Sequence, residues 1–256
     1  MTRTNQHYGW RPDLPDHRDL ALSLPKKAMP KSVSLETGFG DWGVYDQGQL
    51  GSCTANAIAG AVVFAEQKEG AADTTPTKPS RLFIYYAERE IEGSISSDSG
   101  AEIRDGMKVV ATQGYPDEKL WPYVISSFAK KPTPSVYVEA KKDHVLRYYR
   151  VAQTLYSMRL CLAHGFPFVF GITVYDSFES ANVDTTGDVP MPAASEGVLG
   201  GHAVLCTGYD DTTKRFKFRN SWSPTWGRNG SGTIPYAYLV DPNLAGDIWT
   251  IRRETE

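Results

Sequence analysis

The chain has 256 residues, 41% of them hydrophobic, which is enough to form a sizeable core in one large domain or two small ones. Its 27 basic and 30 acidic residues give a net charge of -3 without a basic stripe, so we expect no nucleic-acid partner. The longest largely apolar run, residues 166–175, contains Pro167 and Gly171 and is too short to cross a bilayer, so we expect no membrane span.

The first segment, residues 1–28, is called the N-terminal arm here. It is rich in Pro, Asp, Arg and Lys and has no helical or strand periodicity. It has no apolar stretch typical of a secretory signal, so we expect a cytoplasmic protein, or one exported without a recognisable signal peptide. Segments that stay disordered are usually poor in large apolar side chains. The arm has several, and we therefore expect it to dock on the folded body: Tyr8, Trp10, Leu14, Leu20 and Leu22.

Helical periodicity dominates the front half of the chain. The strongest prediction is a helix over Ser52–Glu69, with Ser52 as its N-cap and Gly70 as its stop. Two further helices are predicted over Pro79–Glu92 and Ala101–Thr112.

The pattern changes after about residue 145, where branched and aromatic residues typical of strands become frequent. A helix is predicted over Thr154–Ala163, and residues 182–199 are expected to form a long surface loop. The predicted strands are 145–151, 168–175, 202–209, 215–221 and 248–251. Helices followed by mostly antiparallel strands indicate an α+β fold with two lobes. We expect residues 29–145 to form the helical lobe and residues 146–256 the β lobe, which together make one domain.

Cys53 lies at the start of the first predicted helix. An isolated cysteine is most often a small buried hydrophobic residue. A thiol in the first turn of a helix, however, is favoured as the thiolate, because the unpaired amides and the helix dipole stabilise negative charge there. Cys53 is therefore a candidate nucleophile. Cys161 and Cys206 lie in apolar helical and strand segments, and we expect both to be core thiols.

Three more residues become informative when they are read together with Cys53. His202 follows two glycines and opens a predicted strand, Asn220 ends another strand, and Gln47 lies six residues before Cys53. Alone, each is more often a structural histidine, a turn residue or a surface amide. Together they could supply a base, a side chain that orients the base, and a donor for an oxyanion hole.

This combination resembles the papain-like cysteine peptidases over about residues 30–251. The resemblance implies a two-lobe papain-like fold, with a central catalytic helix in the helical front lobe and an antiparallel β-barrel-like back lobe. It assigns the catalytic roles to Cys53, His202 and Asn220, and the oxyanion hole to Gln47 and the Cys53 amide. It also implies that Trp222 shields the His–Asn pair. A substrate-binding backbone strip would be formed by Ser99, Gly100 and Ala101.

The implied reaction is thiol-dependent hydrolysis of a peptide or protein substrate through an acyl-enzyme, without a metal or cofactor. Two differences from the family pattern are visible. Leu50 replaces a half-cystine that many members carry three residues before the nucleophile, and Thr54 replaces the usual aromatic residue after it. With only three cysteines in the chain, a reducing compartment fits best.

About 28 residues precede the body of the chain, too few for a core of their own. We therefore add the hypothesis that the N-terminal arm lies over the cleft and restrains activity. Two other classes stay open from the sequence alone. One is a transglutaminase-like acyltransferase, and the other is a catalytically inactive binding protein on the same fold. Cleavage preference, endo- or exopeptidase action and oligomeric state are left open by the sequence.

Overall fold

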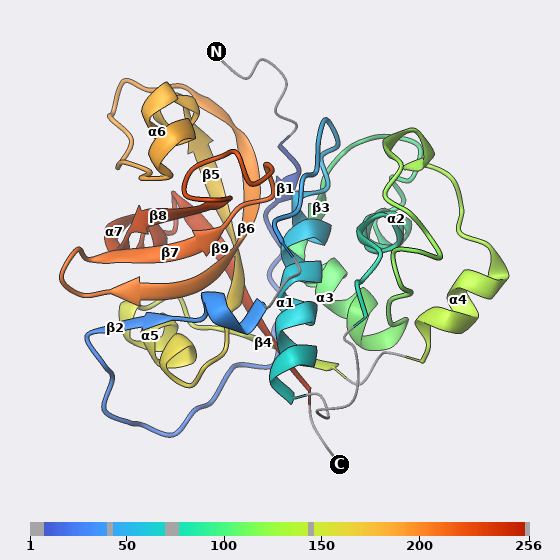
Figure 1. Cartoon of the computed structure of the whole chain (residues 1–256), viewed down its shortest axis with the longest axis horizontal. Helices are drawn as coiled ribbons and strands as arrows, with labels where there is room; N and C mark the ends of the chain where they lie inside the picture. The colour runs from blue at the N-terminus through green and yellow to red at the C-terminus, as the bar shows by residue number, and fades with distance from the viewer. Residues whose placement is uncertain (1–7, 40–42, 70–76, 143–145, 254–256) are drawn as a thin grey trace.

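The computed structural model describes residues 8–39, 43–69, 77–142 and 146–253. Helices α1 (Cys53–Glu69), α2 (Arg81–Ile91), α3 (Ile103–Thr112) and α4 (Pro134–Ala140) gather on one side, and a sheet forms the other side, as Figure 1 shows. The predicted helix over Ser52–Glu69 is confirmed as α1, and the second helix begins slightly later than predicted because Ser80 caps it. The fold is therefore α+β, with helices and sheet segregated as the sequence indicates.

Helix α1 lies at the boundary between the two sides. Its side chains are buried almost all round, which is expected for a helix that runs through a core. Small residues allow this close packing: a Cβ atom added at Gly60 would lie 3.2 Å from Leu205 Cδ2 on the sheet. On its other side α1 packs against α2 and α3. The first residue of α1 is therefore held between the two lobes.

Seven antiparallel strands form the sheet, with the path β4-β9-β5-β6-β7-β8 and with β2 paired to β6. The strands are β2 (Ser32–Ser34), β4 (Leu146–Arg150), β5 (Phe168–Tyr175), β6 (Val198–Asp210), β7 (Arg215–Arg219), β8 (Ser231–Pro235) and β9 (Ala245–Arg253). One face packs on α1, and the other covers a second apolar cluster with α5 (Leu155–Ala163). Cys161 and Cys206 are both fully buried in that second cluster, as predicted.

Several local predictions were wrong. Residues 182–199 do not form one long loop, because Ser180 caps helix α6 (Ala181–Thr186) and β6 already begins at Val198. Ala101–Glu102 is the short strand β3 rather than the first turn of a helix. The pattern also missed β2, β8, α4 and α7 (Tyr236–Val240), because elements of three to seven residues are too short to show periodicity.

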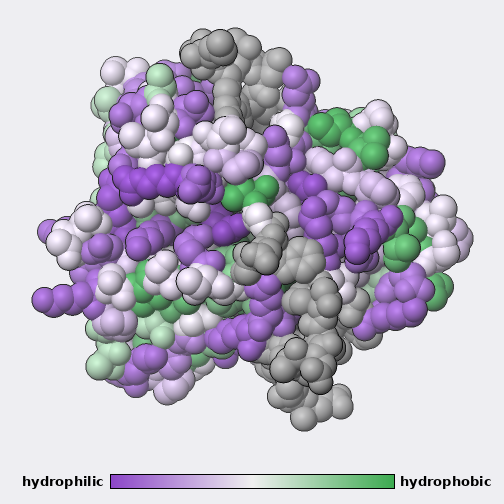
Figure 2. All heavy atoms as spheres, viewed as in Figure 1, coloured by the Kyte–Doolittle hydropathy of each residue, from purple (hydrophilic) through white to green (hydrophobic). Residues whose placement is uncertain are grey.

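The N-terminal side of the chain reaches into both lobes. Strand β2 extends the sheet, and strand β1 (Trp10–Arg11) pairs in parallel with β3 in the helical lobe. Figure 2 shows a mostly hydrophilic surface on the face viewed, with only separate hydrophobic patches. Among the described residues, no helix has the length and apolar character needed to cross a membrane.

Candidate active site

Cys53 is the first residue of α1 and has no exposed surface. Burial raises the pKa of its thiol to about 12, and the backbone N–H groups of Ala203 and Gly9, which bond to the sulfur, offset only part of that rise. The thiol is therefore protonated near neutral pH in this arrangement, although it sits where a helix terminus favours the anion.

His202 lies in β6 opposite Ile172 of β5, and it is also fully buried. Its Nε2 is 2.8 Å from Asn220 Oδ1, which also accepts the N–H of Ser221 at 2.8 Å. Because Oδ1 can only accept, Nε2 carries the proton and Nδ1 is left as the basic nitrogen. Burial lowers the pKa of His202 to about 4, and the bond to Asn220 opposes that shift. His202 is neutral here.

Aromatic rings surround the histidine. The Trp222 ring stacks on the imidazole, with centroids 4.8 Å apart and planes 28° apart. Phe178 contacts both rings edge-on, at 6.3 Å from His202 and 5.4 Å from Trp222. His202 and Asn220 are both buried beside these rings, and a hydrogen bond is stronger in such a low-dielectric setting.

Gln47 is buried in the turn before α1, and its side chain is tied at both ends. Its Nε2 donates to Leu50 O at 2.9 Å, and its Oε1 accepts the Ser221 hydroxyl at 2.7 Å. The Gln47 backbone N–H also donates to Ser221 O at 2.9 Å. Ser221 therefore joins the two predicted halves of the site. Sequence reasoning missed this role, and its only signal was that Ser221 follows Asn220.

The predicted backbone strip lies beside this site, and the N-terminal arm already occupies it. Ala101 N–H donates to Gly9 O at 2.7 Å, while Gly100 has a positive φ of 71° and its N–H donates to Tyr85 Oη at 3.2 Å. The Ser99 hydroxyl bonds to Ser94 instead of to the arm. The strip thus offers backbone groups to an extended segment, as an edge strand does.

The arm passes directly over Cys53 and His202, with residues 1–7 outside the described part of the chain. A Cβ atom added at Gly9 would lie 1.7 Å from Gly51 O, so the arm backbone touches the turn that leads into α1. The Tyr8 ring lies edge-on to His202, at 6.3 Å between centroids, and its hydroxyl donates to Glu179. Two consecutive arm residues therefore lie on the groups next to Cys53: Gly9 on the turn before α1, and Tyr8 on His202.

Ion pairs fasten the following part of the arm. Asp19 bonds to Arg104 at 2.8 Å and to Arg150 at 2.9 Å. Asp13 bonds to Arg150 at 3.0 Å and accepts the Trp249 indole N–H at 2.8 Å. Salt bridges of this partly buried kind hold a segment better than exposed pairs do. The arm is thus fixed on the C-terminal side of Tyr8 and Gly9, the residues that cover the site.

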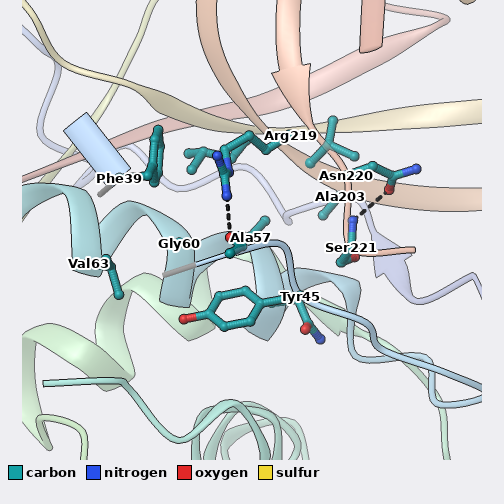
Figure 3. Close-up of a pocket in the computed structure, with 13 residues that line it drawn as sticks. Phe39, Tyr45, Ala57, Gly60, Val63, Ala203, Arg219, Asn220 and Ser221 are labelled. Atoms are coloured by element: carbon teal, nitrogen blue, oxygen red, sulfur yellow. Dashed lines mark hydrogen bonds between the residues drawn. The ribbon is translucent and has the colours of Figure 1, made fainter. Parts of the chain in front are cut away.

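A small cavity lies behind the site, between α1 and the end of β7 (Figure 3). Its volume is about 30 Å³, and Tyr45, Ala57, Gly60, Arg219 and Asn220 are among the residues that line it. Arg219 closes one side by donating to the Gly43 carbonyl. Such a space holds a water molecule but no peptide side chain of any size. This cavity is therefore too small to be a binding site for a peptide side chain.

Comparison with known proteins places this arrangement in a family. The sequence model of the papain family cysteine proteases matches residues 40–237. An uncharacterized peptidase C1-like protein of Acanthamoeba polyphaga mimivirus is 39% identical over 280 residues, which cover 98% of this chain and 88% of that protein. The chain belongs to the papain family and is a cysteine protease by family.

Solved structures agree. The crystal structure of xylellain, a cysteine protease from Xylella fastidiosa, has a TM-score of 0.91 and 41% identity, and the match covers 97% of each chain. Digestive procathepsin L 3 of the Tenebrio molitor larval midgut has a TM-score of 0.69 at 19% identity, covering 92% of this chain and 74% of that one. The second likeness shows the fold alone. The papain-like fold expected from the sequence is confirmed.

Proposed function

We propose that the protein hydrolyses peptide bonds through Cys53, His202 and Asn220, and that its N-terminal arm restrains this activity. The His202–Asn220 bond of 2.8 Å carries the proposal, because it fixes the proton on Nε2 and leaves Nδ1 as a base. Cys53 and His202 come from different lobes, and both contact the same short stretch of the arm.

In the proposed reaction, His202 Nδ1 takes the thiol proton and Cys53 Sγ attacks the carbonyl carbon of the scissile peptide bond. The C–N bond breaks as the imidazolium gives its proton to the leaving amine, which departs and leaves a thioester on Cys53. A water molecule then attacks the thioester while His202 accepts its proton. The C–S bond breaks, the carboxylic acid is released, and the proton returns to the sulfur.

Gln47 is proposed to donate to the oxyanion together with the Cys53 backbone N–H. The Ser221 hydroxyl holds Gln47 Oε1 at 2.7 Å, which orients the amide so that its Nε2 side faces the turn before α1. Trp222 keeps water from the His202–Asn220 bond. Ser99, Gly100 and Ala101 would bind the substrate backbone at the edge that now holds Gly9.

The arm restrains the site in two ways under this proposal. It fills the position of the substrate, and it keeps Cys53 and His202 dry, so that both stay neutral. Release of the arm would rehydrate both groups and allow the thiolate–imidazolium pair to form.

The catalytic part is tested by Cys53→Ala, which should abolish peptide hydrolysis and labelling by a thiol-directed peptidase inhibitor without unfolding the chain. Hydrolysis that persists in this variant refutes the proposed nucleophile. Adding a primary amine to the wild-type assay separates hydrolysis from acyl transfer. Free acid should stay the main product, whereas a main amide product would identify an acyltransferase.

The restraint is tested in the full chain by Gly9→Ala. Because the new Cβ would overlap Gly51 O, this variant should hydrolyse a fluorogenic peptide about 10-fold faster or more, as expected for a docking loss of about 1.4 kcal/mol. Leu14→Ala is the matched control, since that arm side chain is 70% exposed and should not affect turnover. Equal rates in wild type and Gly9→Ala refute the restraint.

A further inference from the structure

A single carboxylate joins two parts of the site that are far apart in the sequence. Asp98 accepts the backbone N–H of Gly51 with both of its carboxylate oxygens, each at 3.0 Å, and its Oδ1 also accepts the Tyr85 hydroxyl. Gly51 belongs to residues 47–52, called the oxyanion turn here, whereas Asp98 directly precedes the backbone strip of residues 99–101. Hydrogen bonds to a carboxylate are stronger than those between neutral groups, so the link between the two parts is a strong one.

On the side of the oxyanion turn, the link reaches the proposed oxyanion donor through one peptide group. The N–H of Gly51 and the C=O of Leu50 belong to the same planar peptide unit. That C=O accepts Gln47 Nε2 at 2.9 Å and the Ser52 backbone N–H at 2.8 Å. Because Asp98 holds the N–H end of this unit, it also fixes the direction of the C=O that orients the Gln47 amide.

On the side of the backbone strip, Tyr85 continues the chain of hydrogen bonds. Its hydroxyl donates to Asp98 and accepts the Gly100 N–H at 3.2 Å. Tyr85 has no exposed surface, and burial, followed by the bond to Asp98, raises the pKa of its hydroxyl, which therefore keeps the proton that it donates. With the Gly100 N–H held by Tyr85, it is the N–H of the next residue, Ala101, that bonds to the arm in the cleft.

The loop that carries Asp98 is itself held in place. Arg89 has no exposed surface, and its Nη1 donates to Ile95 O at 2.8 Å and to Ser97 O at 3.1 Å. The guanidinium also lies over the Tyr85 ring, 4.1 Å from the ring centroid. The carboxylate is therefore fixed before any substrate binds, as a group must be if it keeps parts of a site in register.

The docked arm shows that one extended segment can touch both linked parts at once. Gly9 lies against Gly51 O, where an added Cβ would be 1.7 Å away, and its own C=O accepts the Ala101 N–H at 2.7 Å. A substrate strand that uses the backbone strip must likewise bring its scissile carbonyl to the oxyanion turn. A shift between the two parts would therefore slow the reaction even if each part stayed intact.

We propose that Asp98 is a positioning residue for the reaction, which holds the oxyanion turn and the backbone strip in one fixed relation through Gly51 and Tyr85. This inference rests on the proposed peptidase function and adds to it a residue that acts only through others. Asp98 acts on the oxyanion through the Gln47 amide and on substrate binding through Tyr85. Loss of the carboxylate should lower kcat about 10-fold, less than loss of Gln47 itself, because the turn keeps its other bonds.

The first experiment measures Asp98→Ala in the full chain with Gly9→Ala, which should open the cleft, on a fluorogenic N-acyl dipeptide. The value of kcat should fall about 10-fold. The same change made together with Gln47→Ala should cost less than about 3-fold more, because the donor through which Asp98 acts is already missing. Glu90→Gln is the matched control, since this carboxylate of α2 pairs with Lys131 at 3.5 Å and should not affect kcat.

Tyr85→Phe separates the two halves of the link, because it frees the backbone strip and leaves the oxyanion turn bonded to Asp98. For the dipeptide substrate, KM should rise about 5-fold or more while kcat changes less than about 2-fold. A single-residue ester, too short to reach the strip, should show neither change. A fall in kcat that is equally large for the dipeptide and the ester overturns the role assigned to Tyr85.

Two results of the first experiment overturn the inference for Asp98. One is an unchanged kcat in Asp98→Ala, and the other is a fall by the same factor with and without Gln47, which a merely structural role would give. Failure of the proposed function looks different, namely that no substrate is cleaved by any variant.

A second experiment needs no turnover. Amide hydrogen exchange is compared in the full chain between wild type, Asp98→Ala and the control Glu90→Gln. Exchange should become about 10-fold faster in Asp98→Ala both in residues 47–52 and in residues 99–101, because both lose a bond that held them. The control should match the wild type. Faster exchange in only one of the two segments overturns the inference even if no peptide is cleaved.

Discussion

Acid should release the N-terminal arm through His202. Burial lowers the pKa of His202 from 6.5 to about 4, and Tyr8 of the docked arm supplies part of that burial, so docking favours the neutral ring. A base whose docked pKa is depressed adds docking free energy that is complete above pH 6.5 and is lost as the pH falls toward 4. Linkage with these two values sets the upper limit for an arm that supplied all of the burial, a loss of about 2 kcal/mol between pH 7 and pH 5, or about 20-fold in the docking equilibrium.

A second group opposes this effect. Burial, and then the neighbouring charge of Asp247, raise the pKa of Asp13, so the docked state also favours a protonated Asp13 and gains stability as the pH falls. The effect of His202 must therefore be isolated by a variant. His202→Gln cannot take up a proton and should lose only the acid-driven release, while the contribution of Asp13 stays the same in both proteins.

The assay is the protection of Cys53 from 2,2'-dipyridyl disulfide. Protection is a ratio of two labelling rates. The rate for a protein that carries Trp10→Ala is divided by the rate for the same protein with Trp10 intact. This ratio cancels the intrinsic pH dependence of the thiol. Between pH 7 and pH 5, protection in the wild type should fall relative to protection in His202→Gln, by at most about 20-fold. The same pH profile in both proteins refutes the reasoning.

Gln47→Ala should reduce kcat by roughly 10²–10³-fold with little change in KM, the usual effect of removing one oxyanion donor, and an unchanged kcat contradicts that role. Ser221→Ala, which frees Gln47 Oε1, should lower kcat about 10-fold, and Ser221→Thr should restore part of it. Burial raises the pKa of Glu88 well above its usual range, so its contribution to stability is complete below pH 4.5 and is lost as the pH rises. Glu88→Gln should therefore raise the Tm at pH 8 by about 2–4 °C per kcal/mol regained, with no difference near pH 4 in thermal unfolding.

The family pattern of the site could be read from the sequence because it consists of short motifs that follow one another in a fixed order along the chain. Cys53 follows a turn and opens a long helix, and the spacing to Gln47 and the order of His202 and Asn220 are properties of the chain itself. Short elements such as β2 and β8 escaped because their strand character depends on pairing with distant residues.

The sequence by itself determined the fold class, the family and the residues to which the family assigns chemistry. Tertiary structure alone decided which distant groups meet, because contact between them depends on packing and not on spacing. Gly171 and Gly201, for example, leave room for the Trp10 ring, which a Cβ atom at either position would meet at 2.0 Å or 2.9 Å. The charge states of Cys53 and His202 follow the same rule, since burial in the folded chain shifts both pKa values away from those that an isolated peptide would have.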